Sequence, residues 1–376
     1  MGDWGLVMGE RVALFVGTNK GGFILTSDSA GEKWDVSGPH GRGSSVDHMT
    51  FDGRDGTIYM VENHDIYGPE VSRSTDFGET WETSEKNPRF EKGSGLVMEK
   101  LWNIQPGRES EPGVVYLGAM PASLWRSDDS GRTWHENAGL QRTPTRPNWG
   151  PGAGGLCLHT IILDTDNAGR MAVGISAAVY FRTDDGGETW VRKTDGLPFG
   201  DRPNVIDEDN IEYDTEADNC VHKVVVVDAS DPAVQYMQHH LGVFKTPDFG
   251  DTWEDIGEGL PELFGFPIGS HPRKSGHVWL IPNHSGDFRS ASSGSFRVFK
   301  SEESGSSWCA LTDGLPQENA YLSTLRESVA VDSLDPVGVY VGSKSGVLYG
   351  SRDEGESWFE VAGTLPPILS VEVAVI

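Results

Sequence analysis

The chain has 376 residues, of which 57 are acidic and 30 are basic, so its formal net charge is −27. A surface this negative repels phosphate backbones and anionic lipids, which argues against nucleic acid and membrane partners. Three cysteines do not make a disulfide framework, and residues 1–16 lack the basic and apolar segments of a signal peptide. We therefore expect a protein of the cytoplasm.

An eight-residue pattern recurs from one end of the chain to the other, at intervals of about 50 residues. It reads Ser or Thr, any residue, an acid, any residue, Gly, any residue, Ser or Thr, and Trp. The good copies lie at 74–81, 127–134, 183–190, 246–253, 301–308 and 351–358, and a worn copy with Ser29 in place of the acid lies at 27–34. A repeat of this length, with four short strands in each unit, is typical of a β-propeller blade.

The pattern has the chemistry of a hairpin tip. Its hydroxyl and carboxylate can accept backbone hydrogen bonds, and its Gly can take a positive φ, so the chain can reverse between two strands. We expect the Trp ring to be buried beside the next unit. The sequence thus predicts an all-β fold, a seven-bladed β-propeller of four-stranded antiparallel blades in a single domain over 1–376.

Each unit follows one template, shown best by the second unit. Its innermost strand is predicted at 45–51, its second at 57–61 and its third at 71–74, before the repeated pattern and an outer strand. Residues 11–17 match a second strand, and residues 369–376 match an innermost strand. We therefore predict that the C-terminal strand pairs in the N-terminal blade and closes the ring.

Further features lie between the units. A Gly-Leu-Pro tripeptide closes units at 196–198, 259–261 and 314–316, with the variant Thr-Leu-Pro at 364–366. Three segments are longer than the template allows: 135–155, the acidic 199–219, and 283–295. Two of them directly precede an innermost strand, so they should rise over one mouth of the ring.

The template also sorts the histidines between the two faces of the ring. Loops that enter innermost strands, and loops between second and third strands, fall on the face opposite the repeated turns, which we call the mouth face. The histidines assigned to it are His48, His159 and His222 on innermost strands, and His64, His239, His240 and His284 in loops. This mouth is the expected site.

Two neighbouring innermost strands carry a Cys and a His two residues apart, Cys157 with His159 and Cys220 with His222. Residues two apart on a strand point to the same side. His159 and His222, with His48, could therefore hold zinc, iron or copper. The alternative is that the thiols fill the core and the imidazoles bond between blades. Without a metal, His159 or His222 could serve as a general base.

The segment 317–321 brings a carboxylate, an amide and a phenol to the same mouth. Glu318 and Tyr321, with His159 and His222, are the predicted catalytic residues. The predicted substrate-binding residues are Trp149, Lys100, Asn319 and His240. Glycoside hydrolysis usually needs a second carboxylate, for which Glu62, Glu70 and Glu372 are candidates, although a solvated or strand-capping carboxylate is the simpler interpretation of each.

The repeated pattern resembles the Asp-box, or BNR repeat, of sialidase-like β-propellers. The segments GGLCLH, CVHK, GFPI and LPQENAYL resemble a bacterial group described as exo-α-sialidase or BNR-repeat glycosyl hydrolase. True sialidases have an Arg-Ile-Pro motif and three substrate-binding arginines. Here Arg11-Val12-Ala13 stands in that place, and Arg326 is the one arginine assigned to an innermost strand, so sialic acid is disfavoured. Seven-bladed relatives include xyloglucan-acting hydrolases and a photosystem assembly factor.

Two hypotheses follow. The first is a hydrolase or lyase acting on a glycan or another small organic substrate in a His-rich funnel, with metal assistance if a metal binds. The second is a binding or assembly module that uses the mouth and the acidic segment 199–219 as its contact surface. Titratable groups of different kinds in one mouth favour the enzyme hypothesis, whereas exposed aromatic residues would favour the binding-module hypothesis.

Overall fold

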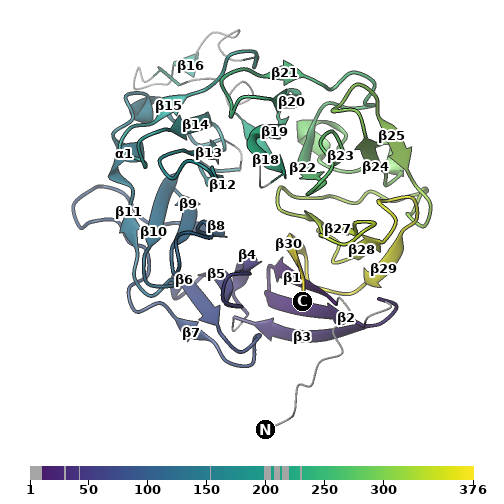
Figure 1. Ribbon diagram of the computed structural model, residues 1–376, viewed down its shortest axis with the longest axis horizontal. Helices are drawn as coiled ribbons and strands as arrows, with labels where there is room; N and C mark the ends of the chain where they lie inside the picture. The colour runs from purple at the N-terminus through teal and green to yellow at the C-terminus, as the bar shows by residue number, and fades with distance from the viewer. Residues whose placement is uncertain are drawn as a thin grey trace.

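The computed structural model describes residues 11–28, 31–41, 43–152, 154–198, 205–206, 212–213, 220–228 and 231–376. Seven four-stranded antiparallel sheets stand around a common axis, with their innermost strands facing the centre of the ring (Figure 1). The chain is a seven-bladed β-propeller, as predicted.

The strands of the first four blades are given from the innermost outward. The first blade has β30 (Ile368–Val375), β1 (Val12–Thr18), β2 (Gly21–Ser27) and β3 (Trp34–His40). The second has β4 (Ser45–Phe51), β5 (Ile58–His64), β6 (Gly68–Ser74) and β7 (Glu82–Thr83). The third has β8 (Lys100–Pro106), β9 (Val115–Met120), β10 (Ser123–Ser127) and β11 (His135–Glu136). The fourth has β12 (Leu158–Leu163), β13 (Met171–Ile175), β14 (Val179–Thr183) and β15 (Val191–Arg192).

The remaining blades follow the same order. The fifth has β18 (Val221–Asp228), β19 (Asp231–His239), β20 (Gly242–Thr246) and β21 (Glu254–Asp255). The sixth has β22 (Gly265–Ser270), β23 (Val278–Pro282), β24 (Val298–Ser301) and β25 (Cys309–Leu311). The seventh has β26 (Val329–Val331), β27 (Val339–Gly342), β28 (Leu348–Ser351) and β29 (Phe359–Ala362). A separate pair consists of β16 (Val205–Ile206) and β17 (Glu212–Tyr213), and the rest of the acidic segment lies outside the described residues.

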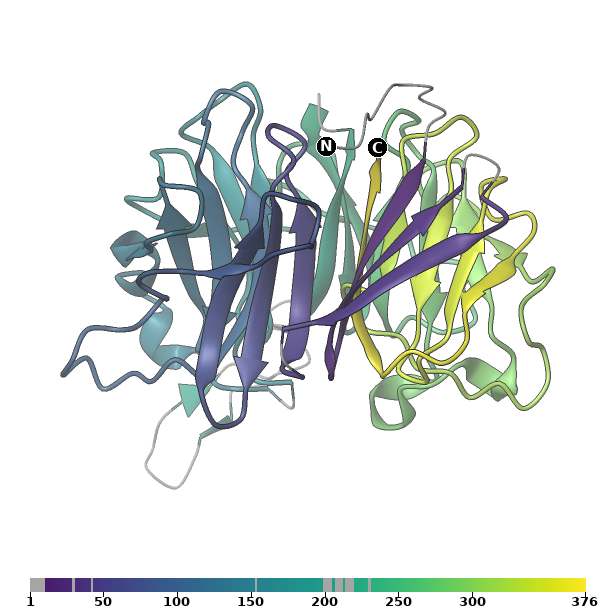
Figure 2. The same ribbon diagram turned by 90° about the horizontal axis from the view of Figure 1, so that it is seen from below.

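The ring closes as the sequence predicted. Strand β30 pairs antiparallel with β1, with Leu14 opposite Val373 and Val16 opposite Val371. Leu14, Val16 and Val371 are almost fully buried. The closing strands thus share one apolar core, and β30 lies beside β1 along its whole length (Figure 2).

The repeated turns form by the expected hydrogen bonds. In the second blade the Ser74 hydroxyl accepts from the Gly78 N–H at 2.8 Å and donates to Asp76 at 2.8 Å, while Asp76 accepts from the Thr80 N–H at 2.9 Å. Gly78 has a φ of 90° and Phe77, before it, a φ of 56°. Two successive positive φ angles reverse the chain, one more than the sequence pattern suggested.

The tryptophan that ends each pattern packs against the preceding blade and not the next one, which corrects our expectation. Trp253 of the fifth blade lies 5.2 Å, centroid to centroid, from Tyr180 of the fourth. Trp34 meets Tyr340 of the seventh blade in the same way, at 6.1 Å. The same direction holds where the ring closes, because Trp34 of the first blade packs on the seventh blade. Each tryptophan therefore joins two blades.

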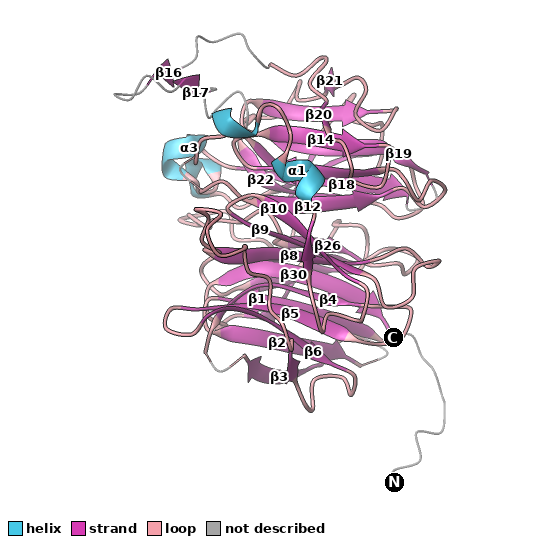
Figure 3. Ribbon diagram, turned by 90° about the vertical axis from the view of Figure 1, so that its left-hand side faces the viewer, coloured by secondary structure: helices cyan, strands magenta, loops and turns pink. Residues whose placement is uncertain are grey.

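The short helices gather on the mouth face, opposite the C-terminus (Figure 3). They include α1 (Ala138–Gln141), η1 (Arg146–Asn148), α3 (Ser285–Phe288) and η2 (Ser292–Gly294). None of the helices in the described ranges has the length and apolar character needed to cross a membrane.

Candidate functional site

Bulges near the mouth end of the innermost strands build the site. The ladder register shifts at Asp47 in β4, Trp102 in β8, His159 in β12, His222 in β18 and Leu369 in β30. A bulge inserts one residue that has no opposite partner and re-aims its side chain. These bulges can therefore direct side chains toward the axis at the mouth end of the innermost strands.

Bulge residues from four blades meet at a pocket of about 220 Å³ on the mouth side of the axis. It is lined by Asp47, Lys100, Trp102, Gly154, Cys220, His222, His240, Phe264, Phe266, Arg289, Leu325, Arg326, Glu327 and Leu369. We call it the mouth pocket. Aromatic walls with a few converging polar groups are the usual composition of a small-molecule site.

Cys220, His222 and His240 form a compact set of metal-type ligands in this pocket. Their ligand atoms all lie within 4.8 Å of one another. The His222 Nδ1 atom lies 2.5 Å from the Gly265 carbonyl oxygen. Because a carbonyl only accepts, Nδ1 carries the hydrogen and Nε2 presents its lone pair. Burial, followed by the charge of Arg326, holds the His222 pKa well below its usual value, so the ring is neutral.

The pocket also gathers cations over its aromatic walls. The Arg326 guanidinium carbon lies 5.8 Å from the Trp102 ring centroid and 5.5 Å from that of Phe266. Arg289 lies 5.8 Å from the same Phe266 centroid. Lys100 pairs with Asp47 at 2.5 Å. Asp47 balances Lys100, so the positive charge over the aromatic walls comes from Arg326 and Arg289.

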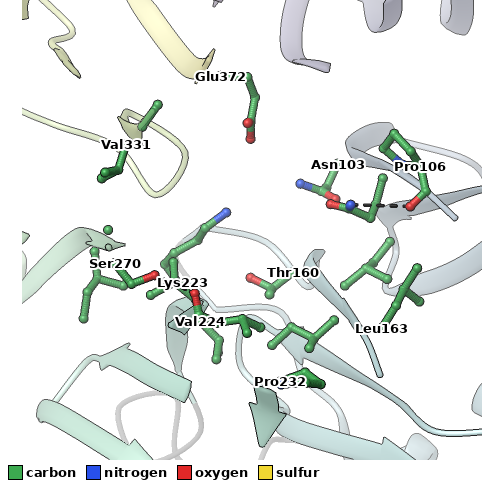
Figure 4. Close-up of a pocket in the computed structure, with 18 of the residues that line it drawn as sticks. Asn103, Pro106, Thr160, Leu163, Lys223, Val224, Pro232, Ser270, Val331 and Glu372 are labelled. Atoms are coloured by element: carbon green, nitrogen blue, oxygen red, sulfur yellow. Dashed lines mark hydrogen bonds between the residues drawn. The ribbon is translucent and has the colours of Figure 1, made fainter. Parts of the chain in front are cut away.

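Below the mouth pocket, a second cavity of about 540 Å³ lies along the axis and runs toward the repeated turns. Lys223 and Glu372 point into it (Figure 4). Lys223 pairs with Glu327, which lines the mouth pocket above. Glu372 accepts from His48 Nε2 at 3.1 Å. Burial acts to raise the Glu372 pKa, but the hydrogen bond and charge of His48 outweigh it, and the pKa is lowered.

The structure does not assemble the predicted trio of His48, His159 and His222. His48 is engaged with Glu372. His159 is fully buried, and its nitrogens bond to the Thr160 hydroxyl and to the Val221 carbonyl, both at 2.9 Å. With both ring nitrogens bonded, His159 serves as a tie between the fourth and fifth blades. Of the three, only His222 lines the mouth pocket.

Four other predicted site residues lie away from this pocket. Trp149 packs on Phe181 at 4.9 Å and lines a separate open depression near the rim. Tyr321 is 67% exposed. Tyr321 lies near Gly294 of η2, and Ala320 donates to the Gly294 carbonyl. The segment containing Glu318 and Asn319 is thereby tied to the 292–295 turn on the rim, which is why these side chains do not line the axis. Lys100 and His240 do line the pocket, as expected.

Pocket residues that the sequence interpretation missed are Asp47, Trp102, Phe264, Phe266, Arg289 and Glu327. A usable signal was present, because Asp47 and Trp102 occupy the same place on their innermost strands as His222. The sequence interpretation did not use this shared position.

A second ligand-type group, His277 with Glu302 and Glu354, lies at the opposite end of the blades. Glu354 there already accepts from Lys274 at 2.5 Å and from Lys300 at 3.0 Å. Burial acts to raise its pKa, but the two lysines outweigh it and lower the pKa to about 2. This group is an ion-pair network, which the lysines already neutralise.

No protein-family model matches the chain. A xyloglucanase from Paenibacillus sp. is 28% identical over 159 residues, which are 39% of this chain and 15% of that protein. This chain therefore spans a small part of that relative. The propeller is similar to the GH74 enzyme of Niastella koreensis, with a TM-score of 0.52 and 14% identity over 96% of this chain and 66% of that one. It is also similar to YCF48 bound to D1 peptide, with a TM-score of 0.53 and 15% identity over 84% and 82% of the two chains. These similarities establish the seven-bladed fold, with glycoside hydrolases and YCF48 among its neighbours.

Proposed function

We propose that the protein is a hydrolase or lyase that acts on a glycan or another small organic substrate in the mouth pocket, assisted by a divalent metal on Cys220, His222 and His240. The observation that carries the proposal is the convergence of these three ligands beside aromatic walls, within 4.8 Å of one another. The Asp-box pattern and its turn geometry support membership of the BNR-repeat propellers. The GH74 neighbours and the xyloglucanase support glycoside chemistry.

The donor set fits a metal in three respects. Thiolate and imidazole together suit zinc, iron and copper. The bond from His222 Nδ1–H to the Gly265 carbonyl fixes the tautomer that a metal-ligating histidine needs. Three protein ligands leave a position for substrate or water, where a bound metal acts as a Lewis acid.

The chain's own residues would position the substrate. The faces of Trp102 and Phe264 offer apolar surface to a sugar ring or a similar skeleton. Asp47 is held by Lys100 at 2.5 Å and by the Asn63 amide at 2.7 Å, so it stays an oriented hydrogen-bond acceptor at the pocket wall.

The test is elemental analysis of protein purified without a His tag, together with turnover on a broad panel of glycosides. We expect one metal per chain in the wild type, and its loss in His222→Gln and His240→Gln. His284→Gln is the matched control, because that half-exposed histidine pairs with Glu262 on the rim. Absence of both metal and turnover would contradict the proposal.

A specific observation favours the second candidate, a binding or assembly module. Large apolar residues are exposed on mouth-face loops, namely Ile66 (81%), Tyr67 (73%), Phe288 (71%) and Tyr321 (67%). The YCF48 neighbour, described as bound to a peptide, supports the same function. Screening of a displayed peptide library tests it. A module would select peptides whose binding is lost in Tyr67→Ser and Phe288→Ser but kept in Val191→Ser, a control on an outer strand.

A further inference from the structure

Two arginines of the mouth pocket have no carboxylate partner among the described residues. The sequence carries 57 acids against 30 bases, so an arginine easily finds an acid elsewhere on the chain. Arg182, which is buried to the same degree, pairs with Asp251 at 3.0 Å. Arg326 is 9% exposed, yet its one side-chain bond within the described part of the chain goes to the Ser176 hydroxyl, at 3.2 Å. Its Nε–H is buried, and no described residue accepts a hydrogen bond from it.

A buried guanidinium without a counter-charge costs free energy, because its hydration has been replaced only in part. Stacking on Trp102 and Phe266 recovers part of that cost. It does not supply the acceptor that Nε lacks. An anionic group in the pocket would supply both the charge and the acceptor.

Arg289 completes the arrangement from the neighbouring loop. Its backbone is left-handed, with a φ of 52°, an uncommon conformation for a residue with a long side chain. Two bonds hold it there, from its own Nε to the Gly286 carbonyl at 2.6 Å and from the Ser323 hydroxyl to its carbonyl at 2.6 Å. Its guanidinium carbon lies 5.8 Å from the centroid of the Phe266 ring that Arg326 also contacts. Two like charges around one ring repel each other unless an anion joins them.

We propose that the substrate carries a carboxylate, bound by Arg326 and Arg289, on a ring that packs against the aromatic walls of the mouth pocket; a sugar acid of the uronate type has this chemistry. The inference deepens the proposed function by naming its substrate class. Arginine forks match the two oxygens of a carboxylate in bidentate geometry. Lys100 takes no part, because Asp47 already neutralises it.

The binding test compares ligand pairs that differ only in the acidic group. Isothermal titration with galacturonate and glucuronate, against galactose and glucose, should show binding of the acids and at least about tenfold weaker binding of the neutral sugars. Arg326→Gln and Arg289→Gln should each weaken acid binding about tenfold or more, because each leaves the anion short of a buried partner. Arg132→Gln, on the exposed turn of the third blade, should change it less than twofold. Galactose 6-sulfate carries a different anion, so its affinity relative to galacturonate distinguishes a site for carboxylates from a site for any anion. Equal affinity for acids and neutral sugars would overturn the proposal.

A second measurement needs no ligand. If Arg326 is a binding group without a partner, Arg326→Met should leave the melting temperature of the free protein unchanged or raise it, since function is gained there at the expense of stability. Arg182→Met is the matched control and should lower it, because that arginine is paired with Asp251. A fall for Arg326→Met as large as that for Arg182→Met would make Arg326 a structural residue and end the proposal. Neither measurement uses turnover or a metal, so failure of the metal site would leave both results standing.

Discussion

The Gly-Leu-Pro tails offer a sharp test of how neighbouring blades are joined. Gly314 has a φ of +82°, and a Cβ built there would lie 2.0 Å from the Trp358 carbonyl oxygen. The Trp358 N–H donates to the Asp313 carbonyl at 2.9 Å, so the sixth blade's tail is bonded directly to the seventh blade's tryptophan. Gly259 begins the same tripeptide with a φ of +89°, but no atom of the described residues lies within 4 Å of its Cβ position. An alanine would have the same backbone strain at either position. The two positions differ only in whether its Cβ would overlap another residue.

The magnitudes follow from this difference. An alanine with a positive φ costs about 1 kcal/mol at either site. At Gly314 the overlap with backbone adds about 2 kcal/mol, since a carbonyl cannot turn aside as a flexible side chain can. For 376 residues the entropy of unfolding is about 0.8 kcal/mol/K, so the melting temperature should fall ~1 °C in Gly259→Ala and ~4 °C in Gly314→Ala.

The assay is thermal unfolding followed by the fluorescence of the chain's 12 tryptophans, which reports the unfolding of the whole propeller. Both variants are compared with wild type in the same buffer. Equal losses at the two sites would refute the reasoning, because they would mean that the tail does not press on the tryptophan of the next blade.

Two further predictions concern charged groups. The hydrogen bonds from Thr80 lower the Asp76 pKa to about 2, so the stability that the Asp76 carboxylate gives the fold is present above pH ~4 and is lost as the pH falls toward 2. In urea titrations across this range, the difference in stability between wild type and Asp76→Asn should shrink on acidification. A constant difference would contradict this prediction. Glu327→Gln leaves the Lys223 ammonium without its partner in the cavity below the mouth pocket and should reduce the unfolding free energy by about 3 kcal/mol. Glu262→Gln, at the half-exposed pair with His284, should reduce it by less than about 1 kcal/mol. Similar losses for both variants would show that the Lys223 pair is not structural.

The fold could be predicted from the sequence because its determinants are local. Each turn is held by residues four apart in the sequence, such as Ser74 and Gly78, and the hydrogen bond expected between these two is present. The closing strand was also visible, since residues 369–376 are an innermost strand without the three that should accompany it. The direction in which the tryptophans pack was not predicted, because it depends on how neighbouring blades meet in space.

The site was harder to predict because neighbouring blades decide what each side chain meets. His159 and His222 follow a cysteine by two residues, and both bond to the innermost strand of the next blade. His159 also bonds to the Thr160 hydroxyl, which uses its second nitrogen. His222 is followed by Lys223, whose side chain pairs with Glu327 instead, and the ligand atoms of His222, Cys220 and His240 lie within 4.8 Å of one another. One following residue separates a structural histidine from a candidate ligand.

The most direct test of the proposed site is titration of tag-free protein with Co²⁺, followed by visible absorption. Coordination by Cys220, His222 and His240 predicts one equivalent of Co²⁺ with a thiolate charge-transfer band and the intense visible bands of a tetrahedral ion. Both should disappear in Cys220→Ser and persist in Cys309→Ser, whose thiol is exposed on β25. A Co²⁺ spectrum without thiolate character, or one unchanged by Cys220→Ser, would contradict the assignment of the ligands.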